Sequence, residues 1–300
     1  MTRETEGEAF ILTQAVFWGL FPVVTILSFT DMSPMVSAGL STLLASVFFG
    51  GVISGQRRWH ELLRRDAWKP IAFATLFIGV IYYGLVFLGA AQTSANNVSI
   101  ILLTESLFTI VVLRLLGAER MSGRSFIGAL VMVCGALIVL FPGRFDVQPG
   151  DLFLIGANIV APMGNIFAQR ARMIVSSSTL MFVRSIVSGV SLLAIGLYLA
   201  PADMNAETLT RSLPFLVVNG VVLLGFSKLL WIEGIHRLSL SKATSLSAIT
   251  PFFTMCFSWL LLDEVPTPWQ VGGAIPLAIG LVILTRRGLY ASNERYATGM

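Results

Sequence analysis

Residues 115–139 read LLGAERMSGRSFIGALVMVCGALIV, and residues 260–284 read LLLDEVPTPWQVGGAIPLAIGLVIL. A shift of 145 positions, without a gap, lays the second stretch on the first and brings Glu264 onto Glu119. Two glycine pairs coincide under the same shift, Gly128 with Gly273 and Gly135 with Gly280. Apolar sequences often match by chance, so the glycines and the glutamate carry the most weight. The pattern indicates a chain built from two copies of one unit.

The composition places both copies in a membrane. Hydrophobic residues make up 55% of the 300 residues and charged residues only 12%, with a mean hydropathy of +0.82. Soluble chains carry roughly 25% charged residues. Because a helix satisfies its own backbone hydrogen bonds in lipid, this composition predicts an all-α membrane protein. We expect one integral membrane domain over residues 1–300, surrounded by the lipid bilayer.

Ten apolar segments approach the length of about 20 residues that a membrane-spanning helix needs. They are residues 9–29, 34–54, 69–90, 95–116, 124–142, 151–169, 178–200, 212–233, 240–262 and 268–286. The fourth and ninth begin with the polar stretches TSANNVS and SLSKATS. The first segment lacks a small-residue cleavage site, so we expect it to be retained as a span.

Each copy holds five of these segments, and five is an odd number. The second copy must therefore enter the membrane in the opposite sense to the first. Inverted repeats of this kind are typical of secondary transporters, whose substrate sites lie between the two copies. The sequence predicts ten transmembrane helices as two inverted five-helix repeats, residues 1–145 and 146–290, around a central cavity.

Basic residues indicate the orientation in the membrane, because loops rich in Lys and Arg stay cytoplasmic. They gather after spans 2, 4, 6 and 8 and in the C-terminal tail, whereas the other side holds only Arg144 and Arg211. We therefore expect a multi-pass protein with both termini in the cytoplasm.

The chain resembles the drug/metabolite transporter superfamily and, within it, the EamA-type ten-helix exporters. The resemblance rests on the two stretches quoted above, each with an acidic residue after the fourth span and spaced glycines along the fifth. Pro251 fits the family pattern in the second copy, while Ser106 stands at the matching position of the first. The chain is most similar to the aromatic amino acid exporters of bacterial inner membranes. This implies a secondary transporter that exports aromatic and other neutral amino acids, or similar small metabolites, by alternating access.

Spans 1 and 6 carry glycine and proline at near-equivalent positions. Span 1 contains Gly19 and Pro22, and span 6 contains Pro162 and Gly164. Proline removes one backbone hydrogen bond from a helix, and interrupted helices often flank transporter binding sites. We therefore predict that spans 1 and 6 are discontinuous and that substrate binds beside their breaks.

Two charges lie deep in predicted spans and belong to different copies, Glu105 and Lys228. We predict that both face the cavity and bind the ammonium and the carboxylate of an amino acid. The sequence leaves open a structural ion pair between the copies, or a Lys228 side chain that snorkels toward water. Glu105 is also the candidate if a proton drives export, and the coupling stays open.

The other candidate substrate-binding residues are polar or aromatic and lie within the spans. They are Trp18, Tyr82, Tyr83, Asn97, Thr104, Asn158, Asn165 and Trp231. Asn158 and Asn165 share one helix face, as do Asn97, Thr104 and Glu105 on another helix. Tyr82 and Tyr83 are adjacent, so we expect one of them to pack. Arg184 lies only two turns into span 7, and we expect it to snorkel to the cytoplasmic surface.

Small residues in spans 5 and 10 form a stripe that allows close helix packing. We expect these spans to serve as scaffold contacts or as the contact of a homodimer. Glu119 and Glu264 each precede a helix start, and we expect each to hold the first turn of the helix that follows.

Motifs of other classes are absent from the sequence, including H-E-x-x-H, G-x-S-x-G and the phosphate-binding G-x-x-x-x-G-K-[ST]. We therefore expect no enzyme, no catalytic residue, no cofactor, no metal and no nucleic-acid partner. An intramembrane enzyme is the rival class. Among transporters, the runners-up are an organophosphate or nucleotide-sugar antiporter and a multidrug exporter of the same fold. Phosphate recognition favours several deep cations, and the sequence places only Lys228 at depth.

Overall fold

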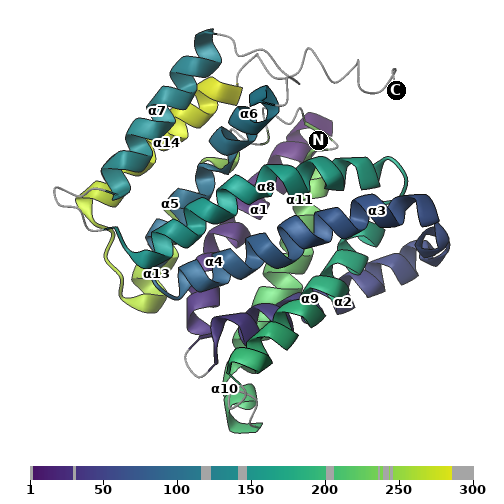
Figure 1. Cartoon of the computed structure of the whole chain (residues 1–300). Helices are drawn as coiled ribbons and strands as arrows, with labels where there is room; N and C mark the ends of the chain where they lie inside the picture. Colours follow the sequence, from purple (N-terminus) through teal and green to yellow (C-terminus); the bar gives the residue numbers. More distant parts are fainter. Residues whose placement is uncertain are drawn as a thin grey trace.

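A computed structural model describes residues 3–29, 32–115, 123–140, 147–200, 206–235, 237–238, 243 and 246–285, and these residues contain no strand (Figure 1). The α-helices are α1 (Arg3–Leu27), α2 (Pro34–Gln56), α3 (Arg65–Ala74), α4 (Tyr83–Ala90), α5 (Ala95–Leu103), α6 (Glu105–Leu115), α7 (Gly123–Leu140), α8 (Pro149–Arg172), α9 (Ser177–Leu199), α10 (Ala206–Val217), α11 (Ser227–Ile235), α13 (Thr250–Leu262) and α14 (Pro268–Thr285). A 3₁₀ helix, η1 (Trp59–Leu63), and two π-helices, η2 (Thr75–Tyr82) and η4 (Val218–Phe226), complete the described helices.

The described helices fit a membrane protein by length and composition. Six stretches are long and apolar enough to cross a membrane: Arg3–Leu27, Pro34–Gln56, Arg65–Ala90, Pro149–Arg172, Ser177–Leu199 and Ala206–Gly234. Three shorter apolar helices are Phe126–Val139, Thr250–Leu262 and Pro268–Ile283. The prediction of an all-α membrane protein is confirmed for this part of the chain. Residues 240–242, 244 and 245, at the start of the predicted ninth span, lie outside it.

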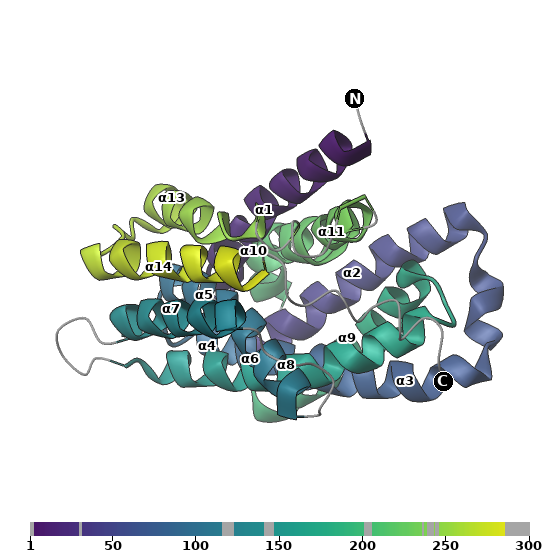
Figure 2. The same ribbon diagram turned by 90° about the horizontal axis from the view of Figure 1, so that it is seen from above.

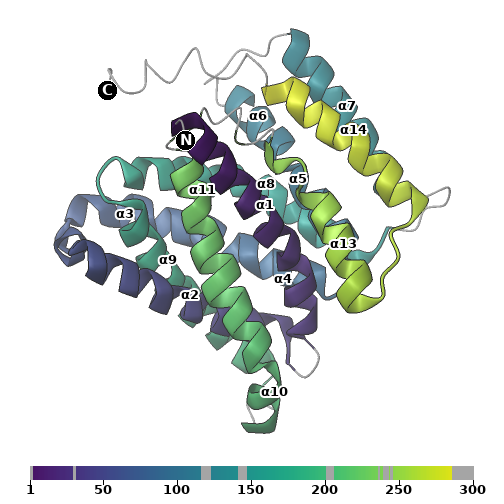
Figure 3. The same ribbon diagram turned by 180° about the vertical axis from the view of Figure 1, so that it is seen from behind.

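The helices form two layers that are closed on each side by a helix pair. One layer holds α1, α11 and α13, and the other holds α3, α4 and α8, as the view from above shows (Figure 2). Figures 1 and 3 show the two layers from opposite sides. The pair α2–α9 closes one side of the bundle and the pair α7–α14 closes the other.

The packing partners of the first copy recur in the second. α1 packs against α11 and α13, and its counterpart α8 packs against α4, α5 and α6. In the pairs α2–α9 and α7–α14, each helix lies against its own counterpart from the other copy.

The glycine stripes of spans 5 and 10 face each other inside the chain. A Cβ atom at Gly135 would lie 2.7 Å from the Gly273 carbonyl oxygen, and one at Gly273 would lie 2.7 Å from the Gly135 carbonyl oxygen. A methyl group on either side would therefore push α7 and α14 apart. The stripes serve as a scaffold contact within one chain.

The prediction that spans 1 and 6 are discontinuous is wrong. α1 runs unbroken from Arg3 to Leu27 through Pro22, and α8 runs from Pro149 to Arg172 through Pro162. Both prolines are buried between neighbouring helices, and this packing holds the helices together across the lost hydrogen bond.

The break lies instead in the fourth span of each copy. At Thr104, between α5 and α6, the backbone has φ −73° and ψ −6°, and its N–H donates to the carbonyl of Ile101 at 2.9 Å. At the matching position of the second copy, Ile249 has φ −76° and ψ −15° and donates to Leu246 at 3.4 Å. A three-residue step thus replaces the four-residue helical step at both places.

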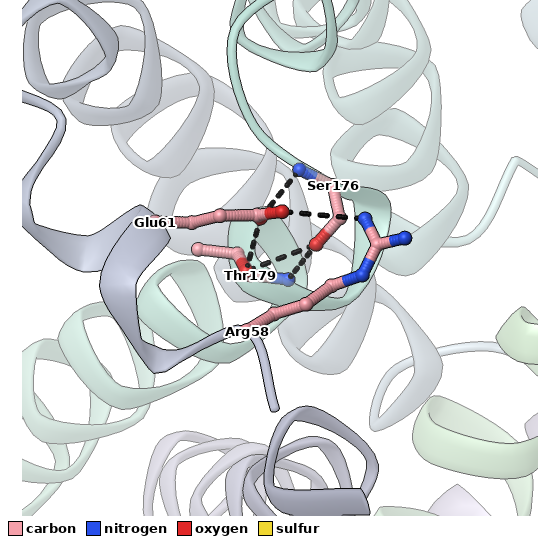
Figure 4. Close-up of polar contacts among 4 residues, drawn as sticks. All are labelled: Arg58, Glu61, Ser176 and Thr179. Carbon is pink, nitrogen blue, oxygen red and sulfur yellow. Dashed lines mark hydrogen bonds and ion pairs between the residues drawn. The ribbon is translucent and has the colours of Figure 1, made fainter. Parts of the chain in front are cut away.

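A partly buried carboxylate fixes the start of α9 at one end of the bundle (Figure 4). Glu61 on η1 accepts hydrogen bonds from the Ser176 backbone N–H and from the Thr179 hydroxyl, both at 2.7 Å. Arg58 pairs with the same carboxylate at 3.2 Å. Burial pushes the pKa of Glu61 upward, but these hydrogen bonds and the Arg58 charge outweigh it and hold the pKa below 4.5. The loop after α2 is therefore fastened to the loop before α9.

We expect Glu61→Gln to lower the free energy of unfolding by about 1–3 kcal/mol at pH 7, because a charged acceptor of two donors is lost. The Glu61 pKa is depressed in the folded protein, so its stabilisation is full above the ordinary pKa and is lost as pH falls through the folded pKa. Thermal unfolding of the purified protein should show a wild-type-to-variant difference at pH 7 that shrinks below pH 4.5. Glu207→Gln, in an exposed pair with Arg211, serves as the control and should change little.

Candidate functional site

The break at Thr104 places Glu105 at the first position of α6, where its side chain points between the two layers. Asn165 on α8 donates a hydrogen bond to Glu105 Oε1 at 2.9 Å. The Tyr82 hydroxyl reaches the same carboxylate from the end of η2. Glu105 and Asn165 are both partly exposed, so neither side chain is sealed in the packed core. A carboxylate held in this way can accept further hydrogen bonds from a bound cation.

Both π-helices end directly before residues of this site. η2 ends at Tyr82 and is followed by Tyr83, and η4 is followed by Ser227 and Lys228. Tyr83 and Lys228 are matched positions of the two copies. π-helical turns shift the direction of the side chains that follow them and are frequent at functional sites. Tyr82 and Tyr83 meet edge to face, with ring centroids 5.3 Å apart, and both are buried.

Lys228 approaches the site from the opposite layer. Its Nζ lies 3.4 Å from the centroid of the Trp18 ring, and Trp18 stacks on Phe21 at 4.6 Å. The charges of Lys228 and Glu105 attract each other, but no ion pair joins these two described residues. We call Glu105, Asn165, Tyr82, Lys228 and Trp18 the central cluster. It presents an anion and a cation from different copies, separated and each partly held by a neutral neighbour.

Asn158 supports the break beneath Glu105. Its Nδ2 donates to the Ile101 carbonyl at 2.7 Å and to the Thr104 hydroxyl at 3.0 Å. The Ile101 carbonyl therefore accepts from a side chain as well as from the Thr104 backbone, which stabilises the break. Asn158 is fully buried, and its Oδ1 has no hydrogen-bond partner among the described residues.

An apolar cavity of about 160 Å³ lies on the other side of the break. Its walls come from α5 to α8 and α14, and Thr104 is the polar residue among Ile100, Ile101, Leu107, Phe108, Val133, Ala136, Leu137, Val139, Ile155 and Leu277. A charged group would lose its hydration there without compensation. The charged chemistry therefore belongs to the central cluster.

Asn97 and Trp231 lie away from the central cluster. Asn97 is near the start of α5, where it donates to Asp151 Oδ1 at 3.4 Å and accepts from Gln270 Nε2 at 2.8 Å. Trp231 packs against the cluster of Ile11, Leu238 and Ala243, in the first half of α1 and the segment after α11. The remaining predicted residues (Trp18, Tyr82, Tyr83, Thr104, Glu105, Asn158, Asn165 and Lys228) gather around the break and the ends of the π-helices.

Arg184 is the charged residue whose position the sequence misjudged. It was expected to snorkel to the surface, but only 8% of it is exposed. Its Cγ packs against Gly79 on η2, about one helical turn before Tyr82 and Tyr83, which places the side chain near the central cluster. The signal was present in the sequence as a cation two turns inside an apolar span, a place where charged residues are usually functional.

Polar contacts between the two copies close the end of the bundle where α5 begins. Ser258 donates to Asn96 at 2.8 Å, and Thr254 bonds Ser99 at 2.9 Å. Glu264 accepts from the Ala95 backbone N–H at 3.2 Å. The expectation that Glu264 holds the next helix is therefore wrong, and Glu119 lies outside the described residues.

The reason lies in the first turn of α14, which has its own caps. Thr267 and Gln270 exchange hydrogen bonds there at 2.9 and 3.2 Å. Glu264 is thus free to cap α5 instead. Burial raises the pKa of Glu264, and the hydrogen bond from Ala95 offsets part of that rise.

The described residues hold no group of three or more His, Cys, Asp or Glu side chains that could bind a metal ion. Within this part of the chain, Cys134 and Cys256 are both free and exposed. The chemistry that the central cluster offers is charge and hydrogen bonding toward a small polar molecule.

Comparison with known proteins connects this arrangement to transporters. The sequence model of the EamA-like transporter family matches residues 5–141 and again residues 148–286. An uncharacterized transporter of Methanothermobacter thermautotrophicus is 24% identical, over 95% of this chain and 88% of the relative. A probable amino-acid metabolite efflux pump of Escherichia coli is 26% identical, over 91% of this chain and 92% of the relative. A solved crystal structure with 14% sequence identity superposes with a TM-score of 0.69, covering 95% of this chain and 99% of the other, which shows a shared fold.

Proposed function

Because the chain belongs to the EamA-like transporter family, we propose that it exports amino acids across a bacterial inner membrane through the central cluster. The family and the names of the relatives make the protein a transporter, not an enzyme. A relative named as a probable amino-acid metabolite efflux pump supports amino acids as the substrate class.

The observation that carries the proposal is the separation of two opposite charges in the central cluster. An amino acid presents an ammonium group and a carboxylate on one carbon. Glu105 accepts hydrogen bonds and suits the ammonium, while Lys228 donates and suits the carboxylate. Asn165 holds the Glu105 side chain, and Trp18 covers the Lys228 ammonium group. The aromatic rings of Trp18, Tyr82 and Tyr83 favour aromatic and other neutral side chains.

We further propose that the ten predicted spans form two inverted five-helix repeats, residues 1–145 and 146–290, which open the site to each side in turn. The double match to the family supports two copies. The matched breaks at Thr104 and Ile249 and the two π-helices support the same relation. Inversion gives a transporter two states of similar free energy, because each copy can adopt the conformation of the other.

The same proposal places both termini in the cytoplasm. The contact between Glu61 and Ser176 brings the loops after α2 and α8 to one end of the bundle. An ion pair of 3.7 Å between Arg237 and Glu6 ties the loop after α11 to the start of α1. Basic residues lie in the loops after α2 and α11 and in the last turn of α8, as expected for the cytoplasmic side.

A homodimer through α7 and α14 is part of the proposal, on the outer faces of these helices. Their glycine stripes are occupied within the chain, while Phe126, Ile127 and Leu130 are more than half exposed. Cys134 lies exposed on α7 and gives a native probe. Oxidative cross-linking in membranes should yield a dimer that Cys134→Ser abolishes, and a wild-type protein that stays monomeric would contradict the contact.

Transport by reconstituted protein tests the function. Liposomes that contain the purified chain should take up labelled neutral and aromatic amino acids faster than empty liposomes, with competition by unlabelled amino acids. The panel should include sugar phosphates and cationic drugs. Uptake of sugar phosphates or drugs without uptake of any amino acid would replace the proposed substrate class.

A further inference from the structure

Arg184 is a buried cation that the proposed amino-acid site does not use. It lies on α9 against η2, where a Cβ at Gly79 would come within 3.2 Å of its Cγ. The absence of a side chain at Gly79 lets the arginine run along η2 toward Tyr82 and Tyr83. Among the described residues, no hydrogen bond or ion pair engages its guanidinium group. The residue is 8% exposed, so its N–H donors remain available to water or to a ligand that supplies acceptors.

The positive and negative charges in and beside the central cluster do not cancel. Glu105 contributes one negative charge, while Lys228 and Arg184 contribute two positive charges that repel each other. The tyrosines beside Arg184 are hydroxyl donors and carry no charge in their ordinary state. A zwitterionic amino acid has no net charge, so its binding would leave one positive charge uncompensated at the depth of the membrane. Uncompensated charges at this depth are costly, and a bound anion removes that cost.

We infer that Arg184 forms an anion subsite of the central cluster, so that the loaded protein binds one negative charge beyond the α-carboxylate of the substrate. This inference rests on the proposed function, because it assigns the α-carboxylate to Lys228. The chemistry is a halide, or a carboxylate on the substrate's own side chain, that accepts from the guanidinium and from the Tyr83 hydroxyl. The anion has two sources, an acidic group on the substrate's own side chain or a small free anion, such as chloride, bound beside a neutral amino acid.

Uptake by reconstituted protein separates these sources. Labelled glutamate and phenylalanine are compared in buffers that contain either chloride or gluconate. An acidic side chain as the source predicts that glutamate is taken up about tenfold better than phenylalanine in both buffers. A free anion predicts phenylalanine uptake that falls about tenfold when gluconate replaces chloride. A wild-type protein that prefers phenylalanine equally in both buffers overturns the inference and leaves the proposed function intact.

Arg184→Gln should remove whichever dependence the wild type shows. Arg211→Gln is the matched control, because Arg211 is an exposed arginine in a surface pair with Glu207. If Arg184→Gln behaves as Arg211→Gln does, the anion subsite is not at Arg184. Arg184→Lys retains the charge without the planar fork and should keep a weakened dependence. It carries the test if the glutamine variant does not fold.

A binding measurement distinguishes this inference from the proposed function. The thermal unfolding temperature of the purified wild type should rise on addition of chloride or glutamate relative to gluconate at equal ionic strength. The rise should be absent from Arg184→Gln and smaller in Arg184→Lys. If no amino acid is transported but the anion-dependent rise disappears with Arg184, the proposed substrate is wrong and the anion subsite stands. No rise in the wild type counts against the subsite.

Discussion

Replacement of Glu105 by glutamine should reduce amino-acid uptake by roughly tenfold to a hundredfold, because a charged hydrogen-bond acceptor for the substrate ammonium is lost. Glutamine has nearly the same shape as glutamate, and its Oε1 can still accept the hydrogen bond from Asn165. The variant should therefore fold and insert normally. Uptake by liposomes that contain equal amounts of folded protein measures the effect.

Two comparisons make the Glu105 result specific. Glu233→Gln removes a carboxylate from a partly exposed ion pair with Arg237 on the same helix as Lys228, and it should leave uptake nearly unchanged. Glu105→Asp keeps the charge but shortens the side chain, so it should fall between wild type and glutamine. Wild-type uptake by Glu105→Gln at every pH would remove this carboxylate from the transport mechanism, whether as an ammonium ligand or as a proton carrier.

Hydropathy and the internal repeat predicted most of the helical framework. The helices α1, α2, α8 and α9 begin and end within a few residues of predicted spans, except that α1 starts earlier at Arg3. This success follows from a simple requirement, since apolar length and backbone hydrogen bonding are both local properties of the chain. The glycine matches likewise indicated close packing by α7 and α14, although not that these two helices pair with each other.

The position of the helix break depends on tertiary contacts and could not be inferred from glycine and proline. Pro22 and Pro162 lie inside continuous helices, whereas Thr104 interrupts a span that contains no proline in the first copy. The break is stabilised by Asn158, which comes from 54 positions farther along the chain and competes for the Ile101 carbonyl. The two π-helices have no comparable signal in the local sequence.

The sequence indicated how far a polar side chain lies from the end of its helix better than it indicated which neighbours the side chain contacts. The sequence identified Glu105 and Lys228 as deep, but it also grouped Asn97 with Glu105 on one helical face. The break at Thr104 separates α5 from α6, so a single helical periodicity does not connect Asn97 to Glu105. Arg184 was misplaced in the opposite way. Its short distance from the helix end suggested that the side chain reaches the surface, but packing against η2 keeps it buried.

Replacement of Lys228 by glutamine should reduce uptake as strongly as Glu105→Gln, and the double variant should be no better than either single variant. If Glu105 and Lys228 each bind a group of the substrate, each substitution removes one substrate contact. A second substitution cannot restore the contact that the first one removed. The opposite prediction belongs to a purely structural ion pair between the two copies. Breaking such a pair on one side leaves a buried charge that costs about 3–5 kcal/mol, and removing the second charge recovers much of that loss.

The double-mutant cycle therefore requires two measurements, uptake and thermal unfolding, on Glu105→Gln, Lys228→Gln and the double variant. We expect inactive but folded proteins whose unfolding temperatures differ little from one another, because no direct ion pair joins these side chains and Trp18 already covers one side of Lys228. Trp18→Leu should weaken uptake by less than Lys228→Gln, since it removes a cation–π contact of about 1–2 kcal/mol and keeps the charge. Two destabilised single variants and a double variant that regains both stability and transport would show that the charges only tie the copies together.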